Sequence, residues 1–173
     1  MEQVSVRTSV LEIGRHDWAS LGCSCGKGAG HLATDLKALL EAADPNEVMG
    51  ITLDGHVEDC SLLFECAVPV VPVILQALQE DLAGFVRGHL LITLWRISLG
   101  DVHADEPAAR RRDIPGECRA ELLRGINVLY REAVSGDTET VLEILDEVEP
   151  DRDRLEYYRR ALSERLEKQR RRS

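Results

Sequence analysis

A chain of 173 residues is the length of one domain, and we expect residues 1–173 to form a single unit with a sizeable core. The formal net charge of −10 opposes the phosphate backbone of nucleic acids and argues against binding to them, and no apolar run approaches the ~20 residues that span a bilayer. The N-terminus has no signal-peptide pattern and the five cysteines have no disulfide pattern, so we expect a cytoplasmic protein.

Composition and periodicity both favour helices. Aromatic residues make up only 4% of the chain, which suits helices packed on helices better than a β-sandwich. Residues 3–13 have a weak alternation, and we interpret them as a short strand or an irregular lead-in. Elsewhere apolar residues recur at helical spacing, so the sequence predicts an all-α fold.

The first predicted helices lie between residues 31 and 56. Residues 31–43 carry one apolar stripe at helical spacing, which predicts an amphipathic helix. Asp44, Pro45 and Glu47 follow as an N-cap, a first-turn proline and a third-position glutamate. This capping-box pattern predicts a second helix that runs to about His56.

The centre of the chain holds two apolar segments without a wide polar face. In the first, we expect a helix or turn over residues 61–67, a bend at Pro69 and Pro72, and then a helix to Gln79. The second segment predicts a helix over residues 82–99. Such helices must be covered on most sides by other helices, and pairs of this kind are the unit of an α-solenoid.

The C-terminal part begins with Gly100, which is placed to end the preceding helix. Residues 101–117 contain two prolines, a glycine and mixed charges, and predict a flexible loop. Helices are predicted over residues 118–134 and 138–148, and a last helix with a narrow apolar stripe begins near Pro150. We therefore expect an α-α superhelix of about three helix pairs plus a C-terminal capping helix.

Residues 63–78, LFECAVPVVPVILQAL, resemble a segment of bacterial HEAT-like repeat proteins in which an aromatic-Glu-Ala-Thr run leads into a Val-Pro step and an apolar helix. Residues 17–19 are similar to the opening Asp-Trp-Ala of that actinobacterial-type family, and residues 85–100 resemble the helix that completes its central repeat. The resemblance implies an all-α superhelical fold, which occurs in many stand-alone actinobacterial proteins of undefined function, some of them immunity proteins that neutralise toxins. Residues 59–61 stand where the family often has His-Gln-Gly, so no role of that histidine transfers to this chain.

Cys23, Cys25 and His31 lie on or beside a glycine-rich loop and form the most suggestive local motif. Zinc sites usually have ligand pairs two to four residues apart and need a second pair. That second pair would have to come from three more distant residues: His56, Cys60 or Cys66. We expect incidental cysteines with no metal and no cofactor, and keep as the alternative an enzyme or a metal- or cofactor-binding protein that uses the Cys23/Cys25/His31 loop.

The remaining candidates for chemistry are interpreted as structural. Cys60 and Cys66 lie in apolar surroundings, so we expect small, inert core thiols rather than nucleophiles. Trp95, in the middle of an apolar helix, is expected in the core, and Trp18 is expected to pin the N-terminal segment; the alternative for either is a contact anchor for a partner. We predict no catalytic residue and no enzymatic activity.

Acidic residues form the candidate binding surface. On a solenoid the second helix of each pair tends to line the concave side, where acids speed the encounter with a cationic protein. The predicted partner-binding residues are Asp54, Glu58, Glu139, Glu143, Asp146 and Glu147. The sequence thus predicts a non-catalytic, cytosolic protein-protein interaction module, specifically an immunity-type inhibitor of a basic partner, and leaves the oligomeric state open.

Overall fold

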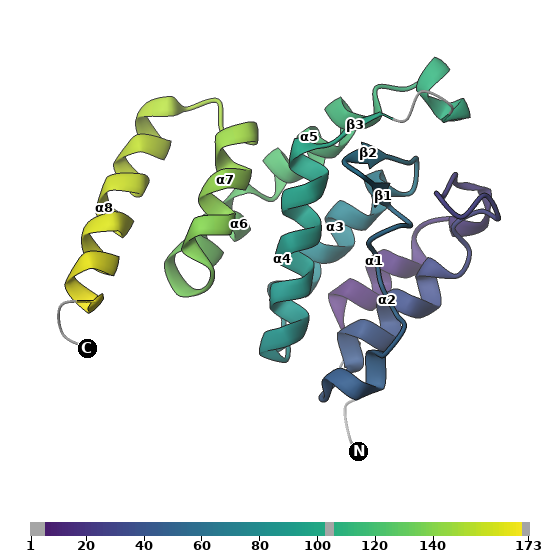
Figure 1. Ribbon diagram of the computed structural model, residues 1–173, viewed down its shortest axis with the longest axis horizontal. Coiled ribbons are helices and arrows are strands. Elements are labelled where there is room, and N and C mark those ends of the chain that lie inside the picture. The colour runs from purple at the N-terminus through teal and green to yellow at the C-terminus, as the bar shows by residue number, and fades with distance from the viewer. Residues whose placement is uncertain (1–5, 103–105, 171–173) are drawn as a thin grey trace.

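The computed structural model describes residues 6–102 and 106–170, without the side chains of residues 166 and 168–170. This part of the chain is mostly helical, as predicted (Figure 1). Its α-helices are α1 (Thr8–Gly14), α2 (Leu32–Glu41), α3 (Ala67–Ala77), α4 (Gly84–Leu99), α5 (Ile114–Arg124), α6 (Ile126–Ser135), α7 (Thr138–Val148) and α8 (Arg152–Arg170). Short 3-10 turns cover Trp18–Ser20, Pro45–Val48 and Pro107–Arg110, and three two-residue strands are β1 (Glu58–Asp59), β2 (Leu62–Leu63) and β3 (Asp101–Val102).

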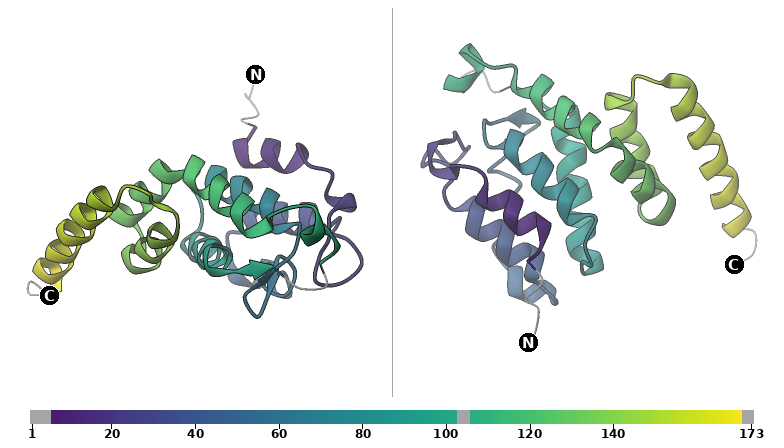
Figure 2. Two further views of the ribbon diagram at one scale, coloured as in Figure 1. Left: turned by 90° about the horizontal axis from the view of Figure 1, so that it is seen from above. Right: turned by 180° about the vertical axis from the view of Figure 1, so that it is seen from behind.

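The helices stand in a row from α1 and α2 at one end to α8 at the other (Figure 1). Helices α1, α3 and α5 contact one another in that order, while α4 contacts α7 and α7 contacts α8. Seen from above, α8 is angled away from the line of the other helices (Figure 2). In the ranges 6–102 and 106–170, no helix combines the length and apolar character needed to cross a membrane.

The core centres on α3 and α4, whose apolar side chains are buried as their composition predicts. Ile74 of α3 and Leu94 of α4 are fully buried. The expected bend at the two prolines is wrong, because α3 begins at Ala67 and continues through Pro72. Pro69 lies in the first turn, where a helix leaves the backbone N–H without a partner, so this proline costs little.

The N-terminal lead-in is helical from Thr8 onward, in contrast to the strand or irregular segment expected over residues 3–13; residues 3–5 lie outside the described part. The start of α1 is capped by Glu80, a residue far away in the sequence. Its carboxylate accepts hydrogen bonds from the Ser9 backbone at 2.8 Å and the Thr8 hydroxyl at 3.0 Å. A cap supplied from such a distance leaves no local signal.

The predicted helix from residue 44 to 56 is wrong beyond its first turn. The capping box is present, since Asp44 accepts from Asn46 and Glu47 accepts from the Asp44 backbone, but it starts only the turn Pro45–Val48. Gly50 and Gly55 have φ angles of +88° and +77°, which a right-handed helix does not contain.

A small hairpin follows, in place of the helix or turn expected over residues 61–67. Strands β1 and β2 are antiparallel, and β3 pairs with β2 in parallel. Cys60 and Ser61 connect β1 to β2 with φ angles of +51° and +66°, a geometry usually occupied by Asn-Gly. This turn exposes Cys60, so its predicted burial is wrong, whereas Cys66 is buried as expected.

The predicted loop over residues 101–117 contains regular structure in its described part; residues 103–105 lie outside it. It begins with β3 and ends in α5, whose N-terminus is capped when Asp113 accepts from the Gly116 backbone. The helix expected over residues 118–134 is two helices that meet at Gly125, whose N–H closes α5 on the Leu122 carbonyl.

A buried carboxylate holds the end of α7 against its neighbours. Glu149 is 1% exposed and accepts hydrogen bonds from the Tyr130 hydroxyl at 2.7 Å and from Arg154 Nε at 2.7 Å. Burial alone would raise the pKa of Glu149, but hydrogen bonds from the Asp151 backbone, Tyr130 and Arg154 lower the pKa below its ordinary value of 4.5.

Candidate functional site

Two of the six predicted partner-binding acids are tied to α4. Arg96 binds Asp54 at 2.6 Å and Glu58 at 3.0 Å. Asp54 is exposed, but Glu58 is only 3% exposed and also accepts from the Ser61 backbone. Glu58 is therefore a structural residue with no free surface for a partner, which corrects the sequence interpretation.

The other four acids lie on α7 and differ in their contacts. Glu139 and Glu147 are exposed and form no ion pair with any other described residue. Glu143 accepts a hydrogen bond from Trp95 Nε1 at 2.6 Å. Asp146 is ion-paired with Arg159 and lies 3.6 Å from Arg152, so its charge is largely compensated within the chain.

Beside these acids, α4 presents an apolar stripe. Ile92 and Leu99 are 47% and 44% exposed, and Trp95 lies between them, half-buried rather than in the core as expected. The 92, 95, 99 spacing places these side chains on one side of the helix. The Trp95–Glu143 bond joins this stripe to α7. We call these two adjoining stripes the α4–α7 face: Ile92, Trp95, Leu99, Glu139, Glu143 and Glu147.

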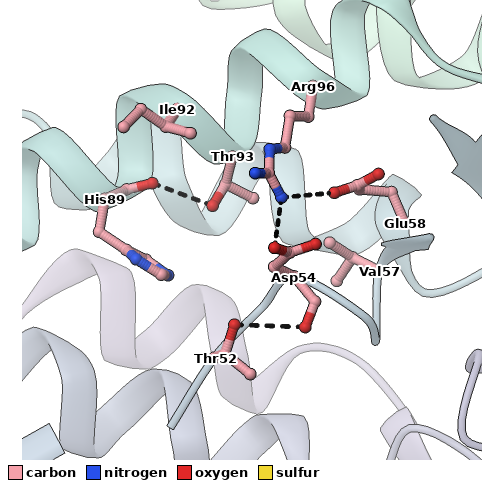
Figure 3. Close-up of a pocket in the computed structure, with 8 residues that line it drawn as sticks. All are labelled: Thr52, Asp54, Val57, Glu58, His89, Ile92, Thr93 and Arg96. Atoms are coloured by element: carbon pink, nitrogen blue, oxygen red, sulfur yellow. Dashed lines mark hydrogen bonds and ion pairs between the residues drawn. The ribbon is translucent and has the colours of Figure 1, made fainter. Parts of the chain in front are cut away.

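A pocket of about 250 Å³ opens next to Ile92, between α4 and the segment before β1 (Figure 3). Figure 3 shows Arg96 reaching Asp54 and Glu58 on one side, with the His89 ring on the other. His89 Nε2 is buried and has no hydrogen-bond partner in the described part of the chain. Burial and the nearby charge of Arg96 lower the pKa of His89 below 6.5, so the ring is neutral at pH 7.

The chemistry available in this pocket is limited. Both pocket threonines use their hydroxyls on backbone carbonyls: Thr93 donates to His89 at 3.0 Å, and Thr52 donates to Asp54 at 3.2 Å. The positive charge of Arg96 is balanced by two carboxylates. Among the described residues, the pocket thus offers a neutral imidazole beside an arginine that is paired with two carboxylates.

A second site forms where the glycine-rich loop meets the segment before β1. The potential ligand atoms of Cys23, Cys25, His31 and His56 all lie within 4.8 Å of one another. His56 Nδ1 is 3.5 Å from Cys23 Sγ and 3.2 Å from His31 Nε2. Cys23 is buried, the two histidines are half-buried, and Cys25 is exposed at the edge. We call these four residues the Cys/His cluster.

Local turns bring the members of the Cys/His cluster together. Gly26 donates its N–H to the Cys23 carbonyl at 3.0 Å, and its φ angle of +70° reverses the loop so that His31 can return toward the cysteines. His56 is 25 residues further along the chain than His31. Its carbonyl accepts from the Ser24 backbone at 3.2 Å and from the Cys66 thiol at 3.5 Å, which fixes the segment beside the loop.

The buried thiols in this region differ in acidity. A hydrogen bond from Cys66, with further bonds from Cys25 and His56, lowers the pKa of Cys23 to about 4, although burial opposes the shift. The same contact and burial raise the pKa of Cys66. Cys23 is therefore the thiolate of the pair, and thiolate is the form that binds metals.

The sequence prediction of no metal depended on the lack of a further ligand. The fold selects His56 among the three candidates, whereas Cys60 is turned outward and Cys66 contacts the His56 carbonyl. The premise that no further ligand is available is therefore wrong, and the absence of a bound metal stays a prediction.

Comparisons of the chain with protein-family models, curated proteins and solved structures gave no match.

Proposed function

We propose that this chain is a HEAT-like α-solenoid that acts as a non-catalytic, cytoplasmic protein-binding module. Its partner is a basic protein, and the α4–α7 face is the binding surface. Five free thiols suit a reducing compartment. The net charge of −10 suits a cationic partner, because complementary charge accelerates encounter.

One observation carries the proposal: an exposed apolar stripe lies directly beside free carboxylates. Ile92 and Leu99 each leave nearly half of their surface in contact with water. Glu139 and Glu147 each lie one helical turn from Glu143, in opposite directions along the same side of α7. An apolar centre with a charged rim is the usual anatomy of a protein-binding surface.

The contacts between helices support the solenoid interpretation. Helices α3 and α4 form one pair, and α6 and α7 form another, while α3–α5 and α4–α7 contacts link successive pairs. Contacts that link each helix pair to the next are typical of repeat proteins. Helix α8 contacts α7 and carries many charges, as a terminal capping helix would.

The specific form that we propose is an immunity-type inhibitor, a small protein that binds a basic toxin and covers its active surface. The support for this form is the resemblance of residues 63–78 to HEAT-like proteins and the acidic charge of the chain. An enzyme that uses the Cys23/Cys25/His31 loop is the competing function. Four converging protein ligands would leave no open position for a substrate, which favours the binding module.

The test starts with capture of partners on the immobilised chain and continues with kinetics. A protein recovered by the wild-type chain is purified, and its association rate is measured over a series of salt concentrations. The variant Glu139→Lys/Glu147→Lys reverses the two free charges of the face. The matched control Glu41→Lys/Glu164→Lys makes the same change in net charge at exposed positions on α2 and α8.

We expect the face variant to slow association about tenfold at low salt and to flatten the salt dependence, because charges at a binding rim act mainly on the rate of encounter. The control should reduce the rate much less. Equal effects of both variants, or a partner without basic character, would contradict the assignment of the face. A small-molecule ligand would contradict the proposed function itself.

A further inference from the structure

Two distances within the Cys/His cluster match those of a tetrahedral metal site. With Zn–S bonds of about 2.3 Å and Zn–N bonds of about 2.0–2.1 Å, ligand atoms in a tetrahedron lie about 3.6 Å apart for sulfur and nitrogen and about 3.3 Å apart for two nitrogens. The corresponding distances here are 3.5 Å from Cys23 Sγ to His56 Nδ1 and 3.2 Å from His31 Nε2 to His56 Nδ1. These two distances match a tetrahedral site, and all four potential ligand atoms lie within 4.8 Å of one another.

The chemical types of the four ligand atoms indicate which metal ion the cluster would bind. Two thiolates and two imidazoles bind zinc well, whereas calcium and magnesium require oxygen ligands. The ligand set contains no carboxylate oxygen, and a tetrahedral site with two sulfur and two nitrogen ligands is typical of zinc among single metal ions.

The surroundings of the cluster hold the ligands in place from two separate segments. The thiol of Cys25 contacts the Gly28 carbonyl at 3.7 Å on the loop side. On the other side, the His56 carbonyl is bound by Ser24 and Cys66. The bonds to the His56 carbonyl fix the backbone that carries this imidazole, whereas the Cys25 thiol gives up its bond to Gly28 when it loses its proton to bind a metal as thiolate.

We propose that Cys23, Cys25, His31 and His56 bind one zinc ion, which joins the glycine-rich loop to the segment before β1. All four positions of the tetrahedron are filled by protein ligands, so the ion is structural. It stabilises the N-terminal end of the fold and performs no chemistry. The zinc proposal does not rest on the proposed partner-binding face.

Metal content of the purified wild-type chain is the first test. Protein refolded with zinc chloride and then dialysed should retain about one zinc per chain by elemental analysis. Titration of the metal-free chain with cobalt(II) should give the intense visible bands of tetrahedral cobalt together with thiolate-to-cobalt charge-transfer absorption. The cobalt measurement uses the wild-type chain, so it does not depend on whether a variant folds.

Variants with matched controls locate the ion. Cys25→Ser removes an exposed ligand, and Cys60→Ser changes an exposed cysteine outside the cluster. His56→Asn removes a half-buried ligand, and His16→Asn changes a half-buried histidine elsewhere. We expect at least a tenfold loss of zinc affinity in the two cluster variants and unchanged affinity in the two controls, with helical circular dichroism recorded for all four.

Three results would overturn the proposal. One is a wild-type chain that retains no zinc after refolding with the metal. Another is a cobalt spectrum with only the weak bands of octahedral coordination. The third is full zinc affinity in Cys25→Ser or an equal loss in Cys60→Ser, which would place the ion elsewhere.

Discussion

Replacing Leu94 by Ala tests the position of the core against an internal control on the same helix. Leu94 is fully buried in α4, whereas Leu99, five residues further along, is 44% exposed. Loss of three buried carbons costs about 2.4 kcal/mol at about 0.8 kcal/mol per group, and the cavity left between α4 and its neighbours adds about 1–2 kcal/mol. We therefore expect Leu94→Ala to lower the free energy of unfolding by about 3–4 kcal/mol.

The matched substitution Leu99→Ala should cost about 1 kcal/mol or less, because nearly half of the Leu99 surface is already in water. For a chain of this length, the Leu94→Ala loss corresponds to a fall in Tm of roughly 6–16 °C. Urea and thermal denaturation followed by circular dichroism, at one fixed zinc concentration, measure both variants. A loss below about 0.5 kcal/mol in Leu94→Ala would show that the core is misplaced. Equal losses would show that Leu99 is covered and that the α4–α7 face is not free.

Two further predictions concern acidity and backbone geometry. Because the pKa of Glu149 is lowered in the folded chain despite burial, its contribution to stability is complete above the ordinary pKa of 4.5 and is lost as the pH falls toward the folded pKa. Denaturation of Glu149→Gln between pH 7 and pH 3 should therefore show a weaker decline than the wild type, and the exposed control Glu147→Gln should not; parallel curves for Glu149→Gln and wild type would refute this. At the hairpin, Cys60→Asn/Ser61→Gly supplies the residues that the two positive φ angles favour and should stabilise the chain by about 1–2 kcal/mol, which urea denaturation measures. A destabilised double variant would show that the two side chains make contacts worth more than the relief of backbone strain.

The helices were predictable where apolar periodicity is strong and local. Helices α2, α4 and α7 lie within the ranges 31–43, 82–99 and 138–148 that the spacing predicts. The helical period of 3.6 residues depends only on residues close together in the sequence, so the apolar pattern can be recognised without knowledge of the fold. The sequence interpretation was wrong where the deciding partner is distant. Helix α1 takes its cap from Glu80, and the β1–β2 hairpin is completed by β3.

The candidate site residues were likewise predictable where they are close in the sequence and not where they are distant. Cys23, Cys25 and His31 were recognisable as a group because they lie within nine residues. His56 was one of three possible further ligands, and only the path of the chain between α2 and α3 decides among them. The outward position of Trp95 was also hidden, because its neighbours on α4 are as apolar as core residues. Its bond to Glu143 depends on a helix that begins more than forty residues later.

The segment from Asp54 to Glu58 lies between the Cys/His cluster and the α4–α7 face. His56 of the Cys/His cluster lies in the chain between Asp54 and Glu58, whose carboxylates form ion pairs with Arg96 of α4. Arg96 is one helical turn from Ile92 and next to Trp95 in the sequence. These ion pairs thus link the segment that carries His56 to the helix that forms the α4–α7 face. If zinc raises the affinity for a partner by some factor, thermodynamic linkage requires that the partner raise the affinity for zinc by the same factor.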